Sequence, residues 1–148
     1  MSAILLQYEL QSKQSYRLGE HIIIDFKLEN LSDHDLWVLS WYTPLEGLKG
    51  RIFDATCDGK PVQYEGIMTK RGNPTREDYI HIPSKGSVSA TIDLSEAYKM
   101  PPECSECKVK FTGRIHDFSD RSEIIPKQNN EHNAIDIPGN VVSFRCVS

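Results

Sequence analysis

The chain has 148 residues, of which 39% are hydrophobic and 26% charged, and its formal net charge at pH 7 is -4. A chain of this size buries roughly 70% of the surface that its unfolded form exposes, so a single domain over residues 1–148 needs no metal or disulfide to fold. Charges of both signs are interspersed along the sequence, which excludes nucleic acid and anionic membrane as the expected partners.

The N-terminal segment has no basic region and turns polar after Ile4-Leu5-Leu6. It therefore lacks the pattern of a signal peptide or an anchor. Apolar runs elsewhere stay far below the roughly 18 residues that a membrane-spanning helix needs. We expect a cytoplasmic protein, or a secreted one if a leader has been removed.

Period-two alternation predicts the first strands. Residues 21–29 alternate apolar with mostly polar side chains, and the apolar set is Ile22, Ile24, Phe26 and Leu28. A turn cluster at residues 30–35 leads to a β-rich run at 36–41, and we expect the two strands to pair as a hairpin. Residues 4–10 add a strand before them.

Further strands are predicted after this hairpin. Residues 51–57 lead into Asp58-Gly59-Lys60, a hairpin-turn signal, and residues 61–64 return from it. Strands are also expected at 79–82, 87–94, 108–115 and 141–147. Two of them have an apolar face, formed by Val88, Ala90, Ile92 and Leu94 and by Val109, Phe111 and Ile115, and Gly113 leaves a gap in the second face that suggests a bulge or a close backbone approach.

The pattern as a whole is that of an all-β protein. About eight or nine short strands separated by turn signals, without a long segment of helical period, predict an immunoglobulin-like antiparallel β-sandwich. The stretch 117–139 is polar and bracketed by Pro126 and Pro138. We expect it to be a long polar surface loop with room for one short helical turn.

The four cysteines are Cys57, Cys104, Cys107 and Cys146. We expect them to be reduced by default. Cys104 and Cys107 have the C-x-x-C spacing of zinc knuckles and redox sites, but a zinc site needs a second such pair and a redox site needs a helix start. A four-cysteine zinc site would require the fold to gather three separate segments. The alternatives are free thiols at a turn and a strained, reducible disulfide between Cys104 and Cys107.

Motifs of the common enzyme classes are absent from the sequence. The histidines are scattered without an H-E-x-x-H pattern, and there is no nucleophile elbow, phosphate-binding glycine loop or dinucleotide fingerprint. We therefore expect a protein that is not an enzyme, with no catalytic residues, no metal and no cofactor.

Two loop-like segments, residues 41–47 and 70–79, combine aromatic, proline, glycine and charged residues. Aromatic side chains anchor protein interfaces and charged ones orient a partner. The candidate partner-binding residues are Trp41, Tyr42, Pro44, Glu46, Lys70, Arg71, Asn73, Asp78 and Tyr79. The alternative is structural: Trp41 and Tyr79 belong to the core, and Glu46 or Asp78 pairs with Arg71 to pin the two loops together.

Several motifs in the same order carry a family resemblance. They are Leu28-Glu29-Asn30-Leu31-Ser32, Val38-Leu39-Ser40-Trp41, Thr43-Pro44-Leu45-Glu46-Gly47, Lys70-Arg71-Gly72 with Asp78-Tyr79, and Ser87-Val88-Ser89-Ala90-Thr91-Ile92-Asp93-Leu94-Ser95 with Ala97-Tyr98. This part of the chain, from about Tyr8 to Phe111, resembles the N-terminal, non-catalytic region of deuterolysin-type zinc metalloendopeptidases, the group that includes peptidyl-Lys endopeptidases. Residues 139–144 resemble the strand that closes the region.

In that family the region precedes a catalytic domain with an H-E-x-x-H helix, which this sequence does not contain, so peptidase activity is not carried over. Residues 101–107 also replace a glycine-containing turn of the relatives. The resemblance implies a prodomain-like protein that binds or inhibits a peptidase, with a zinc metalloendopeptidase as partner and a monomeric or weakly dimeric state.

Three alternatives remain at the level of sequence. Asn73-Pro74-Thr75 resembles a loop of chagasin-like cysteine-peptidase inhibitors. An adhesion or assembly module would act through a sheet edge such as residues 4–10, or by self-association. A thiol or metal protein would use Cys104 and Cys107.

Overall fold

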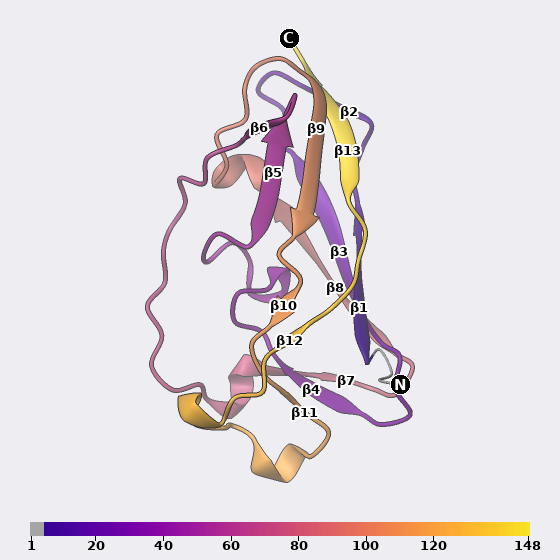
Figure 1. Cartoon of the computed structure of the whole chain (residues 1–148), viewed down its shortest axis with the longest axis vertical. Helices are drawn as coiled ribbons and strands as arrows, with labels where there is room; N and C mark the ends of the chain where they lie inside the picture. The colour runs from indigo at the N-terminus through magenta and orange to yellow at the C-terminus, as the bar shows by residue number, and fades with distance from the viewer. Residues whose placement is uncertain (1–4) are drawn as a thin grey trace.

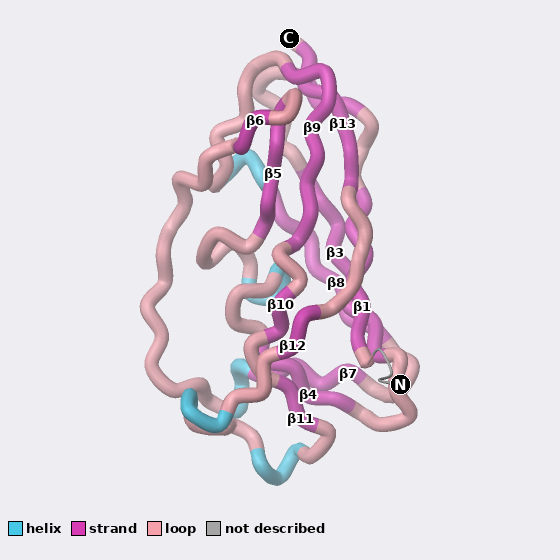
Figure 2. Tube along the Cα trace, in the orientation of Figure 1, coloured by secondary structure: helices cyan, strands magenta, loops and turns pink. Residues whose placement is uncertain are grey.

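The structure, a computed structural model, describes residues 5–148 apart from the side chain of residue 129, and its regular elements are strands and short 3-10 turns. The strands are β1 (Leu6–Gln11), β2 (Ser15–Arg17), β3 (Ile23–Asn30), β4 (Leu36–Leu39), β5 (Phe53–Cys57), β6 (Lys60–Pro61), β7 (Tyr79–Ile82), β8 (Ser87–Asp93), β9 (Cys104–Phe111), β10 (Arg114–Ile115), β11 (Phe118–Ser119), β12 (Ile135–Asp136) and β13 (Val142–Val147). The 3-10 turns are η1 (Pro44–Glu46), η2 (Arg76–Asp78), η3 (Leu94–Glu96), η4 (Ser122–Ile124) and η5 (Asn129–Glu131), which Figure 2 shows as isolated helical segments.

The described strands form four sheets, ordered β2-β13-β9-β5-β6, β1-β3-β8, β11-β4-β7 and β10-β12. Pairing is antiparallel except between β2 and β13. Figure 1 shows the five-stranded sheet in front of β3 and β8, with β4, β7 and β11 gathered at the opposite end of the molecule from the C-terminus. The expectation of an all-β fold with antiparallel sheets is confirmed.

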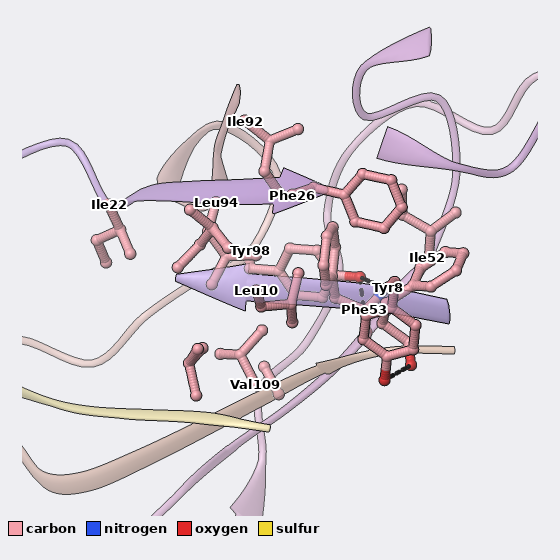
Figure 3. Close-up of a cluster of buried hydrophobic side chains, with 14 of the residues drawn as sticks. Tyr8, Leu10, Ile22, Phe26, Ile52, Phe53, Ile92, Leu94, Tyr98 and Val109 are labelled. Carbon is pink, nitrogen blue, oxygen red and sulfur yellow. Dashed lines mark hydrogen bonds between the residues drawn. The ribbon is translucent and has the colours of Figure 1, made fainter. Parts of the chain in front are cut away.

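The core lies between the sheet of β1, β3 and β8 and the sheet of β5, β9 and β13. The ring of Phe111 on β9 lies 5.2 Å from that of Tyr8 on β1 and 5.5 Å from that of Phe26 on β3. Figure 3 shows apolar side chains from both sheets converging here. Because burial of one large apolar side chain stabilises by roughly 1.5–3 kcal/mol, these contacts hold the two sheets face to face.

Local patterns place most strands correctly. The apolar residues predicted for the strand at 21–29 are buried, whereas the mismatched Ile23, the first residue of β3, is 41% exposed. The predicted hairpin turn joins β5 to β6, with positive φ angles of 49° at Asp58 and 84° at Gly59. These angles are those of the tight turns that Asp-Gly favours. Ile4, the first residue of the first predicted strand, lies outside the described residues.

The predicted hairpin between residues 21–29 and 36–41 is wrong. β3 pairs with β1 and β8, while β4 pairs with β7 and β11, so the turn between them transfers the chain from one sheet to another. Asn30 fixes this change of direction from a buried position: its Nδ2 donates to the carbonyls of His34 and Ile82, at 2.8 and 3.0 Å. A period-two pattern identifies a strand but not its neighbours.

A later segment covers the outer edge of β1. Tyr8 N donates to the carbonyl of Pro138 at 3.0 Å. The side chain of Asn140 accepts a hydrogen bond from Leu10 N at 2.6 Å and donates one to Leu10 O at 2.9 Å. Gly139 is required at this crossing, because a Cβ atom there would collide with the Tyr8 ring. The sheet edge first considered for assembly is therefore occupied by the chain itself.

The stretch 117–139 differs from the predicted long polar surface loop. It contributes β11 to the sheet with β4 and β12 to the pair with β10, and it contains two 3-10 turns, η4 and η5. Asp117, Ile125 and Ile137 are buried. The polar sequence predicted a surface loop because buried polar residues, rather than a regular apolar stripe, attach this segment to the core.

Candidate functional site

A cluster around Arg71 joins the two predicted loops. The Arg71 guanidinium lies over the rings of Trp41 and Tyr42, at 4.9 and 5.1 Å, and its Nη2 donates to Glu46 Oε2 at 2.6 Å. The side chains of Arg71 and Glu46 are 17% and 12% exposed. A guanidinium fits this environment because it stacks on aromatic faces while it pairs with a carboxylate.

The first loop holds Glu46 in position by its own hydrogen bonds. Thr43 begins the turn η1, where its Oγ1 accepts from Leu45 N at 3.1 Å and donates to Ser40 O at 2.7 Å. The turn carries Glu46 back toward Tyr42, whose backbone N donates to Glu46 Oε2 at 2.6 Å. The same carboxylate oxygen thus accepts hydrogen bonds from the Tyr42 backbone and from the Arg71 side chain.

The long segment between β6 and η2 is attached to the body near Arg71. Tyr42 Oη donates to Thr69 O at 3.3 Å, and Thr69 N donates to Lys49 O at 3.2 Å. In Figure 1 this segment runs as an extended strip along the left side of the molecule. Ile67 and Met68 are 58% and 76% exposed, and Lys70 is also exposed. We name residues 67–70 the exposed strip.

The candidate residues divide by burial. Trp41, Pro44 and Tyr79 are buried, so they cannot be direct contacts for a partner in this conformation. Tyr42, Glu46, Arg71 and Asp78 are half-buried, and Lys70 and Asn73 are exposed. Sequence reasoning missed Ile67 and Met68, an apolar pair within a polar loop, and that isolated pair was the available signal.

Asp78 does not pair with Arg71, whereas Tyr79 packs in one buried hydrophobic cluster with Trp41. Asp78 Oδ2 accepts from Thr75 N at 2.8 Å and so stabilises the start of η2. Of the two carboxylates considered as partners of Arg71, Glu46 is therefore the one that pairs with it.

A buried polar network surrounds Tyr79. Its hydroxyl donates to Asp117 Oδ2 at 2.5 Å, and Asp117 Oδ1 lies 2.6 Å from Lys127 Nζ. Burial, together with the hydrogen bond to Asp117, raises the pKa of Tyr79 well above its ordinary value. Lys127 Nζ also donates to the carbonyl of Phe118 at 3.0 Å. Because both charges are buried and partnered, the network fixes residues 117–127 to the β7 strand.

The predicted disulfide between Cys104 and Cys107 is wrong, as is the default of four reduced cysteines. Cys104 is bonded to Cys57, with a Cα–Cα distance of 5.8 Å, and Cys107 and Cys146 are free and buried. Because β5 and β9 are neighbours, Cys57 lies beside both cysteines of β9, and its bond is to Cys104 although Cys107 is the residue directly opposite it. Burial and the adjacent Cys146 raise the pKa of Cys107 to about 12, so this thiol is not a ready nucleophile.

Comparison with known proteins gives one weak similarity. Over 81 residues, 55% of this chain, the sequence is 27% identical to a protein of Aeromonas hydrophila described as an extracellular protease. The match covers 23% of that protein's length. No protein-family profile matches the sequence. Part of this chain is therefore similar to a part of a protein that is described as an extracellular protease.

Within residues 5–148, none of the helical segments has the length and apolar character that crossing a membrane requires.

Proposed function

We propose that the chain is a non-catalytic protein-binding module with an immunoglobulin-like β-sandwich, and that it binds or inhibits a peptidase. The observation that carries this proposal is the exposed strip, which presents Ile67, Met68 and Lys70 on a base stabilised by Arg71. An extended segment with outward side chains is a common form in which a polypeptide enters a binding groove.

The comparison and the sequence resemblance supply the class of partner. The similar protein is described as an extracellular protease, and the motifs around residues 28–98 resemble the non-catalytic region of deuterolysin-type enzymes. A non-catalytic region that accompanies a peptidase domain is expected to recognise that domain. A zinc metalloendopeptidase is therefore the proposed partner.

The Arg71 cluster supports binding indirectly. Binding costs less when the contacting segment is already held in its bound form. Arg71, Tyr42 and Glu46 anchor the C-terminal end of the exposed strip to a turn that has its own hydrogen bonds. Lys70 then projects a cation, and Met68 an adaptable apolar side chain, toward the partner.

An extracellular location is the second part of the proposal. Disulfides such as Cys57–Cys104 persist mainly in oxidising compartments. The similar protein is also described as extracellular. We favour this location over the cytoplasmic one, and expect a monomer or weak dimer that acts through loops, because the β1 edge is covered by Asn140.

The test is a titration of the protein into a deuterolysin-type zinc endopeptidase, followed by residual activity. Replacement of Met68 and Lys70 by serine should weaken inhibition at least tenfold, about 1.4 kcal/mol, without a change in melting temperature. Lys110→Ser, an exposed lysine on β9, is the matched control and should inhibit like the parent. Inhibition by the double variant as strong as that of the parent would show that the strip is not the contact.

A further inference from the structure

The four cysteines, from three separate parts of the sequence, meet at one end of the five-stranded sheet. Cys57 ends β5, Cys104 and Cys107 lie on β9, and Cys146 lies near the end of β13. These three strands are neighbours in the order β13-β9-β5. Cys107 lies opposite Cys57 on one side, and Cys104 lies opposite Cys146 on the other.

A β-bulge brings Cys104 and Cys107 to the same face. Residues three apart on a regular strand point to opposite faces. Between Phe144 and Cys146 the register shifts, so that the single residue Arg145 of β13 opposes Ser105 and Glu106 of β9. Both cysteine side chains consequently point inward, and Cys104 and Cys107 are 4% and 0% exposed.

The neighbouring hairpin turn stabilises this bulge. The Asp58 carboxylate accepts hydrogen bonds from Glu106 N at 2.9 Å and from Ser105 N at 3.3 Å. Asp58 N in turn donates to Glu106 O at 2.9 Å. These hydrogen bonds therefore stabilise the bulge, and the bulge holds Cys104 and Cys107 next to Cys57.

The distances between the sulfur atoms match a small coordination site. The Sγ atoms of Cys57, Cys104 and Cys107 all lie within 4.8 Å of one another, and Cys107 Sγ lies 3.7 Å from Cys146 Sγ. A tetrahedral zinc ion with Zn–S bonds of about 2.3 Å needs its sulfur ligands about 3.8 Å apart. Cys146 lies directly opposite Cys104 in the β13–β9 pair, where Cβ atoms are about 4.5–5.5 Å apart, so Cys146 is placed to supply the fourth ligand.

We propose that, once the Cys57–Cys104 bond is reduced, the four cysteines bind one zinc ion as a tetrathiolate site. A phosphine reductant supplies the two electrons: it takes an oxygen atom from water to become a phosphine oxide, and the two protons of that water convert the disulfide to two thiols. Zinc then displaces the four thiol protons and forms four Zn–S bonds.

Four thiolates select a soft or borderline ion such as zinc over magnesium or calcium, which prefer oxygen ligands. Zinc and the disulfide exclude each other, because both use the sulfurs of Cys57 and Cys104. Two mutually exclusive cross-links thus join β5 to β9: the disulfide in oxidising surroundings and the zinc site in reducing ones. This inference does not depend on the proposed peptidase partner.

Cobalt(II) and native mass spectrometry test the site. The protein reduced with phosphine under anaerobic conditions should bind one cobalt ion per chain, with the strong visible bands of tetrahedral cobalt thiolate, and zinc should replace it. The unreduced protein is the control and should show no such bands. A reduced chain that keeps its far-ultraviolet circular dichroism but binds no cobalt would overturn the proposal.

Single substitutions separate this site from weaker two-cysteine binding. Cys146→Ser and Cys57→Ser should each lower the affinity for cobalt at least tenfold and reduce the thiolate band intensity. Because one of these variants can fail to fold, both are compared with the parent by circular dichroism before titration. Cobalt affinity and spectra unchanged in a folded variant would show that the sulfur of that residue is not a ligand.

Discussion

Arg71 combines the two roles that the sequence left open for it. Its guanidinium packs on Trp41 and Tyr42 and pairs with Glu46, so it belongs to the structure, yet it lies next to the exposed strip. We expect Arg71→Ala to lower the free energy of unfolding by about 2 kcal/mol. The substitution removes the stacking on the two rings and leaves the largely buried Glu46 carboxylate without its ion-pair partner. Urea unfolding measures this loss.

Arg71→Lys provides the matched comparison. Lysine keeps the charge but cannot reproduce the planar stack, so it should recover only part of the stability. Full recovery by lysine would show that charge alone, rather than stacking on Trp41 and Tyr42, stabilises the cluster.

His116 gives a residue-scale prediction on pH. Its ring lies 4.9 Å from that of Tyr42, and burial, with smaller contributions from Arg114 and His132, lowers its pKa below the ordinary 6.5. Below pH 6.5 the unfolded chain therefore binds a proton at this position before the folded chain does. Stability is unaffected by His116 above that pH and falls as the pH decreases from 6.5 toward the lowered folded value.

His116→Gln should accordingly flatten the dependence of the free energy of unfolding on pH in that window, as measured by urea unfolding at several pH values. His34→Gln, an exposed histidine in the turn after β3, serves as control. An equal pH dependence in the parent and in His116→Gln would contradict the assignment.

At the scale of elements, Asn140 holds strand β1 to the segment before β13. Its two hydrogen bonds to the backbone of Leu10 join positions 130 residues apart in sequence. We expect Asn140→Ala to cost about 1–3 kcal/mol, since it leaves partly buried backbone groups without partners. Amide exchange at Leu10 should accelerate. Asn140→Asp retains the acceptor and should cost less, whereas equal losses would argue against a specific role for the amide.

The Cys57–Cys104 disulfide also acts between elements, since it closes a loop with a sequence separation of 47 residues. By the chain-entropy relation, a loop of this length stabilises by at most about 4 kcal/mol. The Cys57→Ala, Cys104→Ala double variant should lose about 2–4 kcal/mol when metal is removed by a chelator. Loss of less than about 1 kcal/mol would indicate that the unfolded chain is not constrained by this bond.

Across the whole molecule, local patterns predicted strands well and their pairing poorly. The alternation of Ile22, Ile24, Phe26 and Leu28 lies within nine consecutive residues, and the Asp58-Gly59 turn is equally local. The partners of β3 depend on residues far away, and no local pattern shows that β4 leaves for another sheet. Strands of two or three residues, such as β2, β11 and β12, are too short to have a detectable period.

The candidate site was predictable to the same extent. Residue types identified the two loops, and the structural alternative anticipated the pairing of Glu46 with Arg71. Whether Trp41 faces solvent or the interior depends on what covers it, which the sequence does not encode locally. The four cysteines were likewise unpredictable as a group, because their meeting depends on the order of three strands and on a bulge at Ser105 and Glu106.

Amide hydrogen exchange, with and without a deuterolysin-type zinc endopeptidase, tests the central claim most directly. A peptidase-binding module acting through the exposed strip should show slower exchange at residues 67–70 and little change elsewhere. The edge strand β8 provides an internal comparison for assembly through a sheet. Slower exchange along β8 alone, or no change anywhere in the chain, would contradict the account.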